Sequence, residues 1–157
     1  MRIEINMKKL NVIIIALIAT LATANAQVLT VSNNLDSPGQ YTTIADAVAA
    51  ANDGDTILVA GSLKTYQGGS IDTKKVHIIG AGYKPDKQVQ FNTTIYSIGF
   101  NNSGSVLSAS GSSIQGCEIR TLGVRGVSSI TIKRNKIGGI QIGTNLESTS
   151  GINFFNN

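Results

Sequence analysis

The side chains best suited to chemistry in this sequence are few and far apart. Asp53 and Asp55 contribute two carboxylates to one turn, whereas calcium is held by about six to eight oxygen ligands. His77 is the only histidine, and it lies in an apolar stretch with no nucleophile near it in sequence. We therefore expect no metal and no cofactor, and a structural role for His77.

Acid–base work on a sugar needs a pair of carboxyl groups. Residues 106–157 contain only two acids, Glu118 and Glu147, and no aspartate, so the catalytic residues of this chain stay unknown. Four basic residues are candidates for lining a groove that binds an acidic sugar, with solvated surface charge as the alternative; they are Arg120, Arg125, Lys133 and Arg134.

The composition favours short strands over helices. Charged residues make up 14% of the 157 residues, against about 25% in an average soluble protein. The sequence has 17 glycines, two prolines and no tryptophan. Its net charge is +4, which falls near +2 without the first 26 residues, so the charge gives no reason to propose a nucleic-acid partner.

The N-terminus has the three parts of a secretory signal peptide. Lys8 and Lys9 precede an apolar run over residues 10–21, and a small-x-small site ends at Ala26. Cleavage after Ala26 makes Gln27 the mature N-terminus.

A membrane anchor is the alternative, but a spanning helix needs roughly 20 apolar residues. We therefore expect a secreted or cell-surface protein with no membrane span after cleavage. Translation begins at Met1 or at Met7, since a complete leader follows either residue.

The positioning elements begin with a short strand and a helix. Residues 28–31 alternate apolar and polar side chains, as a strand does. Thr43 and Asp46 form a capping box. The helix has one apolar face, made by Ile44, Ala47, Val48 and Ala51. A helix of roughly nine residues is unstable alone, so we expect it to cover the open end of a β-stack.

Downstream, residues 56–60 and 76–79 have the pattern of buried strands, with glycines such as Gly68 and Gly69 as breaks. Whole motifs then recur. Residues 132–137 match 114–119 at an offset of 18, and other matches have offsets of 21 and 22.

Periods near 20 are typical of a solenoid. Isoleucines of successive repeats are then expected to stack about 4.8 Å apart. Asn135 and Asn157 occupy equivalent turn positions and predict an asparagine ladder. Cys117 falls at the same position one repeat earlier, which favours a small packed residue over a reactive thiol. A single cysteine excludes an internal disulfide.

Residues 41–60 and 74–82 resemble the pectin-lyase-like superfamily of secreted bacterial proteins. The resemblance lies in the segments Tyr-Thr-Thr-Ile-Ala-Asp-Ala, Gly-Asp-Thr-Ile and Lys-Lys-Val-His-Ile-Ile-Gly-Ala-Gly. It implies an all-β fold, a right-handed parallel β-helix (solenoid) with a short N-terminal capping α-helix. The domains are then a signal peptide (1–26), an N-terminal strand and capping helix (27–55), and β-helix coils (56–157). The loop after Gly61 is slightly longer than the family pattern, and a β-sandwich is the alternative fold.

Two functions follow from this reading. The first is a cell-surface or extracellular module that binds polysaccharide or is adhesive, with no catalytic residues in this chain. The second is the N-terminal part of a polysaccharide lyase or pectinesterase-like enzyme. The missing aspartates favour the first. We also expect the β-helix to be incomplete at its C-terminus, and such a truncated stack is expected to self-associate edge to edge.

Overall fold

The computed structural model describes residues 26–82, 91–102, 104, 108–143 and 148–157. The predicted leader lies outside the described residues except for Ala26, which is exposed beside the equally exposed Gln27. Glu147 also lies outside them. In the part described, no helix has the length and apolar character needed to cross a membrane.

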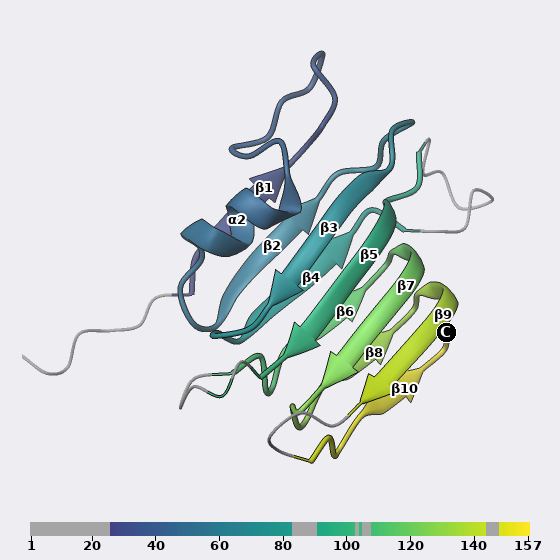
Figure 1. Cartoon of the computed structure of the whole chain (residues 1–157). Helices are drawn as coiled ribbons and strands as arrows, with labels where there is room; N and C mark the ends of the chain where they lie inside the picture. Colours follow the sequence, from purple (N-terminus) through teal and green to yellow (C-terminus); the bar gives the residue numbers. More distant parts are fainter. Residues whose placement is uncertain (1–25, 83–90, 103, 105–107, 144–147) are drawn as a thin grey trace, which may run out of the picture.

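The chain is mostly β, with two parallel sheets and one short helix (Figure 1). The six-stranded sheet has the order β1 (Val28–Val31), β2 (Asp55–Val59), β4 (Val76–Gly80), β6 (Ser113–Gln115), β8 (Thr131–Lys133) and β10 (Asn153–Phe155). The four-stranded sheet has the order β3 (Tyr66–Ile71), β5 (Thr94–Asn101), β7 (Glu118–Arg125) and β9 (Lys136–Gly143). From β2 onward the chain alternates between the two sheets.

The helix α2 (Ile44–Ala50) begins where the sequence predicts. The Thr43 hydroxyl oxygen accepts a hydrogen bond from the Asp46 amide at 3.1 Å. The helix lies against β1, β2 and β3, at the opposite end of the molecule from β10 (Figure 1). Lys74 Nζ donates to the carbonyls of Val48, Ala49 and Ala51, and so satisfies the C-terminal end of the helix.

Aligned apolar residues from successive strands build the core. In the six-stranded sheet one inward column consists of Leu29, Ile57, Ile78, Ile114, Ile132 and Phe154. These pairings confirm the offsets of 21, 18 and 22 residues that the sequence motifs indicate. Each fully buried isoleucine contributes about 1.5–3 kcal/mol, so the column is a main source of stability.

The four-stranded sheet supplies the opposite wall. One of its columns consists of Tyr66, Ile95, Ile119 and Ile137, and another of Ile71, Phe100, Val124 and Ile142. Reading Gly68 and Gly69 as a break is wrong, because both lie inside β3. Gly68 has φ +87°, and a Cβ there would overlap the Ser97 carbonyl oxygen, so the strand requires glycine at this position.

Candidate functional site

The outer face of the four-stranded sheet is shaped by a bend in its strands. In β5 and β7 two consecutive side chains face outward, Tyr96 with Ser97 and Arg120 with Thr121, although strand residues normally alternate. Gly139 pairs with Thr121 and continues this row into β9. The bend therefore gathers neighbouring outward residues on one face, which we call the Tyr96 face.

The aromatic end of this face is formed by two side chains on adjacent strands. The Tyr96 ring is 53% exposed, and the guanidinium carbon of Arg120 lies 6.0 Å from its centroid. This separation falls at the outer limit of a cation–π contact. The pair offers an apolar ring face together with a donor group that suits hydroxyls and carboxylates.

A hydrogen-bonded row of polar side chains lies at the far ends of the same strands. Asn101 Nδ2 donates to Ser70 Oγ at 2.6 Å and to Asp72 Oδ1 at 3.0 Å. On the next strands, an Arg125 guanidinium nitrogen donates to Gln141 Oε1 at 3.0 Å. These bonds hold the row in place while their donors and acceptors stay at the surface.

Glycines form the floor between the two ends. A Cβ on Gly123 would lie 3.7 Å from Gly99 Cα, and one on Gly139 would lie 3.7 Å from the Arg120 carbonyl oxygen, both ordinary contacts. Neither Gly123 nor Gly139 has positive φ. Packing and backbone geometry therefore do not require glycine, which costs about 0.5–1 kcal/mol relative to alanine in a strand. Such a glycine often marks a place where a ligand approaches the backbone.

The Tyr96 face carries positive charge. Glu118 and Lys136 at its edge form the one ion pair among the described residues, at 2.7 Å, and so neutralise each other. Arg120 contacts a neutral ring, and Arg125 contacts a neutral amide. Two guanidinium groups therefore lie on the face without a carboxylate partner in the described part of the chain.

The structure separates the basic residues singled out in the sequence. Arg120 lies on the four-stranded sheet, whereas Lys133 is exposed on β8 of the six-stranded sheet. Arg134 follows Lys133 in a turn, with φ +53° and its amide bonded to the Phe155 carbonyl. The three do not form one groove. Sequence reasoning missed Tyr96 and Asn101; the signal available was the shared offset of 24 residues that relates them to Arg120 and Arg125, as it relates Ile95 to Ile119.

The ladder candidates lie at one turn of successive repeats. Asn135 is fully buried, and its Oδ1 accepts the Cys117 amide at 3.0 Å, while its Nδ2 donates to the Ile114 carbonyl at 3.0 Å. Asn157 Oδ1 accepts the Asn135 amide at 2.9 Å. Burial raises the pKa of the Cys117 thiol to about 12, so the thiol stays protonated and unreactive at neutral pH.

Residues with catalytic side chains elsewhere have structural partners. His77 Nδ1 lies 2.9 Å from Ser113 Oγ across two strands, but within the described chain no carboxylate is hydrogen-bonded to His77 to orient it. Asp53 accepts the Lys75 amide, and Asp55 accepts the amides of Gln27 and Asn52. In the described chain, no three His, Cys, Asp or Glu side chains are grouped to hold a metal ion.

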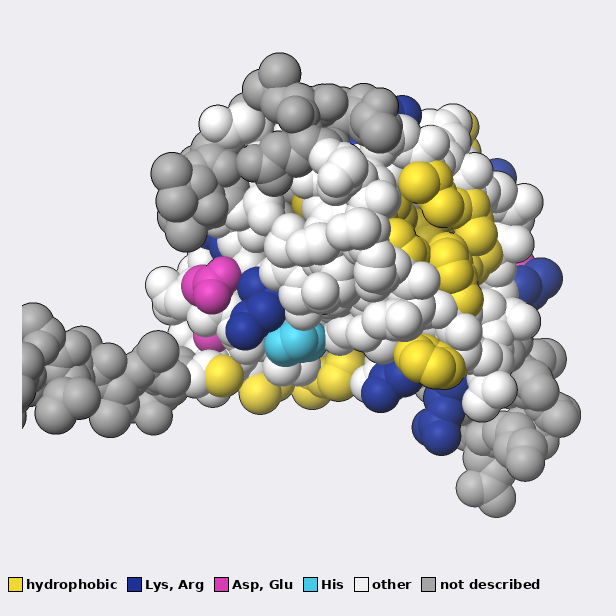
Figure 2. Space-filling model, turned by 90° about the horizontal axis from the view of Figure 1, so that it is seen from below, with side chains coloured by type: hydrophobic (Ala, Val, Ile, Leu, Met, Phe, Trp, Pro, Cys, Tyr) yellow, Lys and Arg dark blue, Asp and Glu magenta, His cyan; other side chains and the backbone are white. Residues whose placement is uncertain are grey.

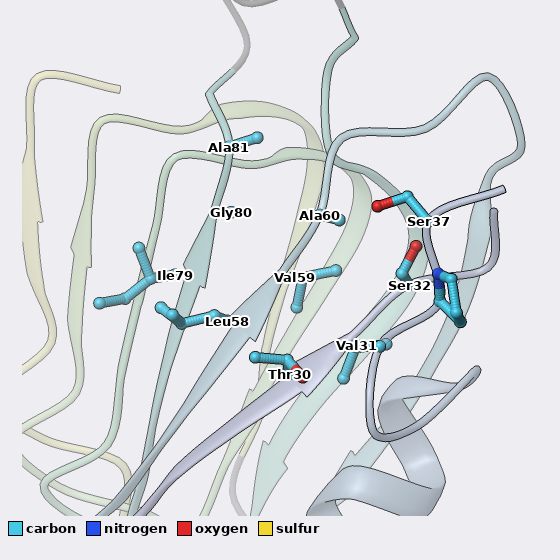
Figure 3. A pocket seen from close by; sticks show the side chains of 12 residues that line it. Thr30, Val31, Ser32, Ser37, Leu58, Val59, Ala60, Ile79, Gly80 and Ala81 are labelled. Atoms are coloured by element: carbon cyan, nitrogen blue, oxygen red, sulfur yellow. The ribbon is translucent and has the colours of Figure 1, made fainter.

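A shallow groove of about 410 Å³ lies across the ends of β1, β2 and β4, beside the loop at Ser37 (Figure 3). Leu58 and Ile79 line it, and the Ser32 and Ser37 hydroxyls lie on the loop side. It has no charged lining residue, so it offers fewer orienting groups than the Tyr96 face.

Comparisons with known protein families, with characterised proteins and with solved structures gave no match. The function is therefore argued from the geometry of the Tyr96 face.

Proposed function

We propose that this chain is an exported, right-handed parallel β-helix protein that binds polysaccharide on the Tyr96 face and acts as a surface or adhesive module. Support for the β-helix comes from the alternation of strands between two parallel sheets and from inward columns that keep register through successive repeats. A solenoid of this kind offers long regular outer faces, which suit an extended polymer.

Support for export comes from the leader motif and from the contact made by the proposed new N-terminus. The Gln27 backbone nitrogen lies 2.7 Å from Oδ1 of Asp55, whose side chain is buried. Cleavage after Ala26 turns this amide into an α-ammonium group, so the contact becomes a charge-assisted hydrogen bond. Mass spectrometry of the secreted product tests this; an N-terminus other than Gln27 contradicts the proposed site.

The single observation that carries the binding proposal is the bare floor at Gly123 and Gly139. A flat sugar ring placed there contacts backbone, with Tyr96 at one end and the Asn101 row at the other. The ring face of Tyr96 suits the apolar face of a sugar, and the polar row supplies both donors and acceptors. Arg120 and Arg125 favour a sugar that carries carboxylates.

Affinity electrophoresis through gels containing polygalacturonate or a neutral β-glucan tests this proposal. We expect retardation by polygalacturonate and about tenfold weaker binding for Arg120→Ala, since a hydrogen bond to a charged group is worth about 1.5–3 kcal/mol. Lys133→Ala is the matched control, because it removes an exposed cation from the other sheet. Equal losses for the two variants, or no retardation in any gel, refute the proposed face.

A further inference from the structure

The two ends of the sheet stack differ in how their edges are covered. At the first end, the outer edge of β1 is hydrogen-bonded by the following loop. Thr30 exchanges bonds with Gln40 and with the Tyr41 amide, and the Ser32 amide donates to the Tyr41 carbonyl. Helix α2 covers β3 at the same end. Both edges there are closed to further pairing.

At the other end, no described segment pairs with the outer edges of β9 and β10. Their inward residues continue the core columns but are open to solvent. Ile140 is 44% exposed, Ile142 59% and Phe154 41%. Figure 2 looks onto this end from below and shows apolar side chains gathered on it.

The size of this apolar end matches an interface. Taking about 200 Å² for each large side chain, the exposed fractions of Ile140, Ile142 and Phe154 leave roughly 300 Å². Ile137 and Ile152 are partly exposed and add to it. A standard interface buries about 800 Å² per partner, of which a little over half is apolar. The end therefore supplies most of the apolar area that a stable dimer needs.

We propose that this end docks onto the same end of a second copy of the chain. The inward side chains at the end carry no charge, so two copies meet without like-charge repulsion. A two-fold axis running across both sheets sets β9 against β9 and β10 against β10 of the second copy, antiparallel, and both open edges gain backbone hydrogen bonds. Because the opposite end is closed by α2 and Tyr41, the assembly stops at two chains and does not form a filament.

Sedimentation equilibrium of the full chain, between about 1 and 100 µM, tests the proposal within the range of ordinary dimer affinities. We expect a mass twice that of the chain. Ile142→Lys places a charge at the interface twice, and we expect it to weaken the dimer about a hundredfold, or about 2.8 kcal/mol at 1.4 kcal/mol per tenfold. Leu63→Lys is the matched control, because Leu63 is 86% exposed in a loop away from the end.

Circular dichroism and melting of both variants establish that each is folded, and hydrogen exchange gives a second measure that needs no variant. In the wild type, outer-edge amides of β9 and β10 are expected to gain protection as concentration rises. A wild type that stays monomeric overturns the proposal, as does a mass that keeps growing beyond two chains. A dimer that Ile142→Lys leaves intact places the contact elsewhere and also overturns it.

Discussion

The floor of the Tyr96 face leads to an unusual expectation, in which stability rises while binding falls. Replacing Gly123 and Gly139 together by alanine adds two methyl groups that meet only ordinary contacts at 3.7 Å. Each Gly→Ala change at a compatible backbone position stabilises by about 0.4–1 kcal/mol, through the unfolded chain. The two sites lie on neighbouring strands and are not paired with each other, so we expect about 1–2 kcal/mol for the double variant.

The same methyl groups project from the floor where the sugar ring is proposed to lie. They hold the ring away from the backbone, and polygalacturonate retardation is expected to weaken by about tenfold, equivalent to about 1.4 kcal/mol. Urea unfolding gives the stability, and affinity electrophoresis gives the binding. The neighbour Gly138 supplies a matched contrast, because a Cβ there would lie 2.9 Å from the Arg120 carbonyl oxygen. Gly138→Ala is therefore expected to destabilise the fold.

A stabilised double variant that binds as tightly as the wild type refutes the role of the glycine floor. A destabilised double variant refutes the physical reasoning instead, because it shows that the strands require glycine at these positions. The two failures are distinguishable, since each belongs to a different measurement.

Three further outcomes are expected. Asn135→Ala leaves the Cys117 amide and the Ile114 carbonyl without their partner, so urea unfolding should show a loss of about 2–4 kcal/mol at about 1–3 kcal/mol per buried group; Asn153→Ala, at an exposed residue, should cost little, and equal losses contradict the ladder. Because folding raises the Cys117 pKa from 9.0 to about 12, the wild type should lose stability relative to Cys117→Ala by about 1.4 kcal/mol per pH unit above pH 9, and a constant difference rules this out. Burial and the nearby Lys75 lower the pKa of His77 below 6.5, so its contribution is present above pH 6.5 and is lost as pH falls through the folded pKa; an NMR titration midpoint above 6.5 contradicts this.

Much of the β architecture was predictable because it repeats locally. Stacking places equivalent isoleucines in contact, so their offsets appear directly in the sequence, as for Ile57 with Ile78 and Ile114 with Ile132. The helix start was predictable because a capping box involves only neighbours, Thr43 and Asp46.

The Tyr96 face was not predictable in the same way. Two consecutive outward residues in β5 and β7 break the alternation on which strand patterns rest. Gly68 and Gly69 lie within a strand because the Ser97 carbonyl approaches one of them, a contact between residues far apart in sequence. Charge type alone grouped Arg120 with Lys133, although the chain turns from one sheet to the other between them and places them on different surfaces.

The constant register of the inward columns also gives the fold a freedom in its length. Each strand pairs with an equivalent strand about one repeat away, so duplicating or deleting a whole repeat between Cys117 and Asn135 changes the length of the molecule while its cross-section stays the same. A change of one residue is different, because it moves a whole strand's inward side chains to the outside. Evolution in this architecture is therefore expected to proceed by whole units, with single-residue insertions confined to the loops.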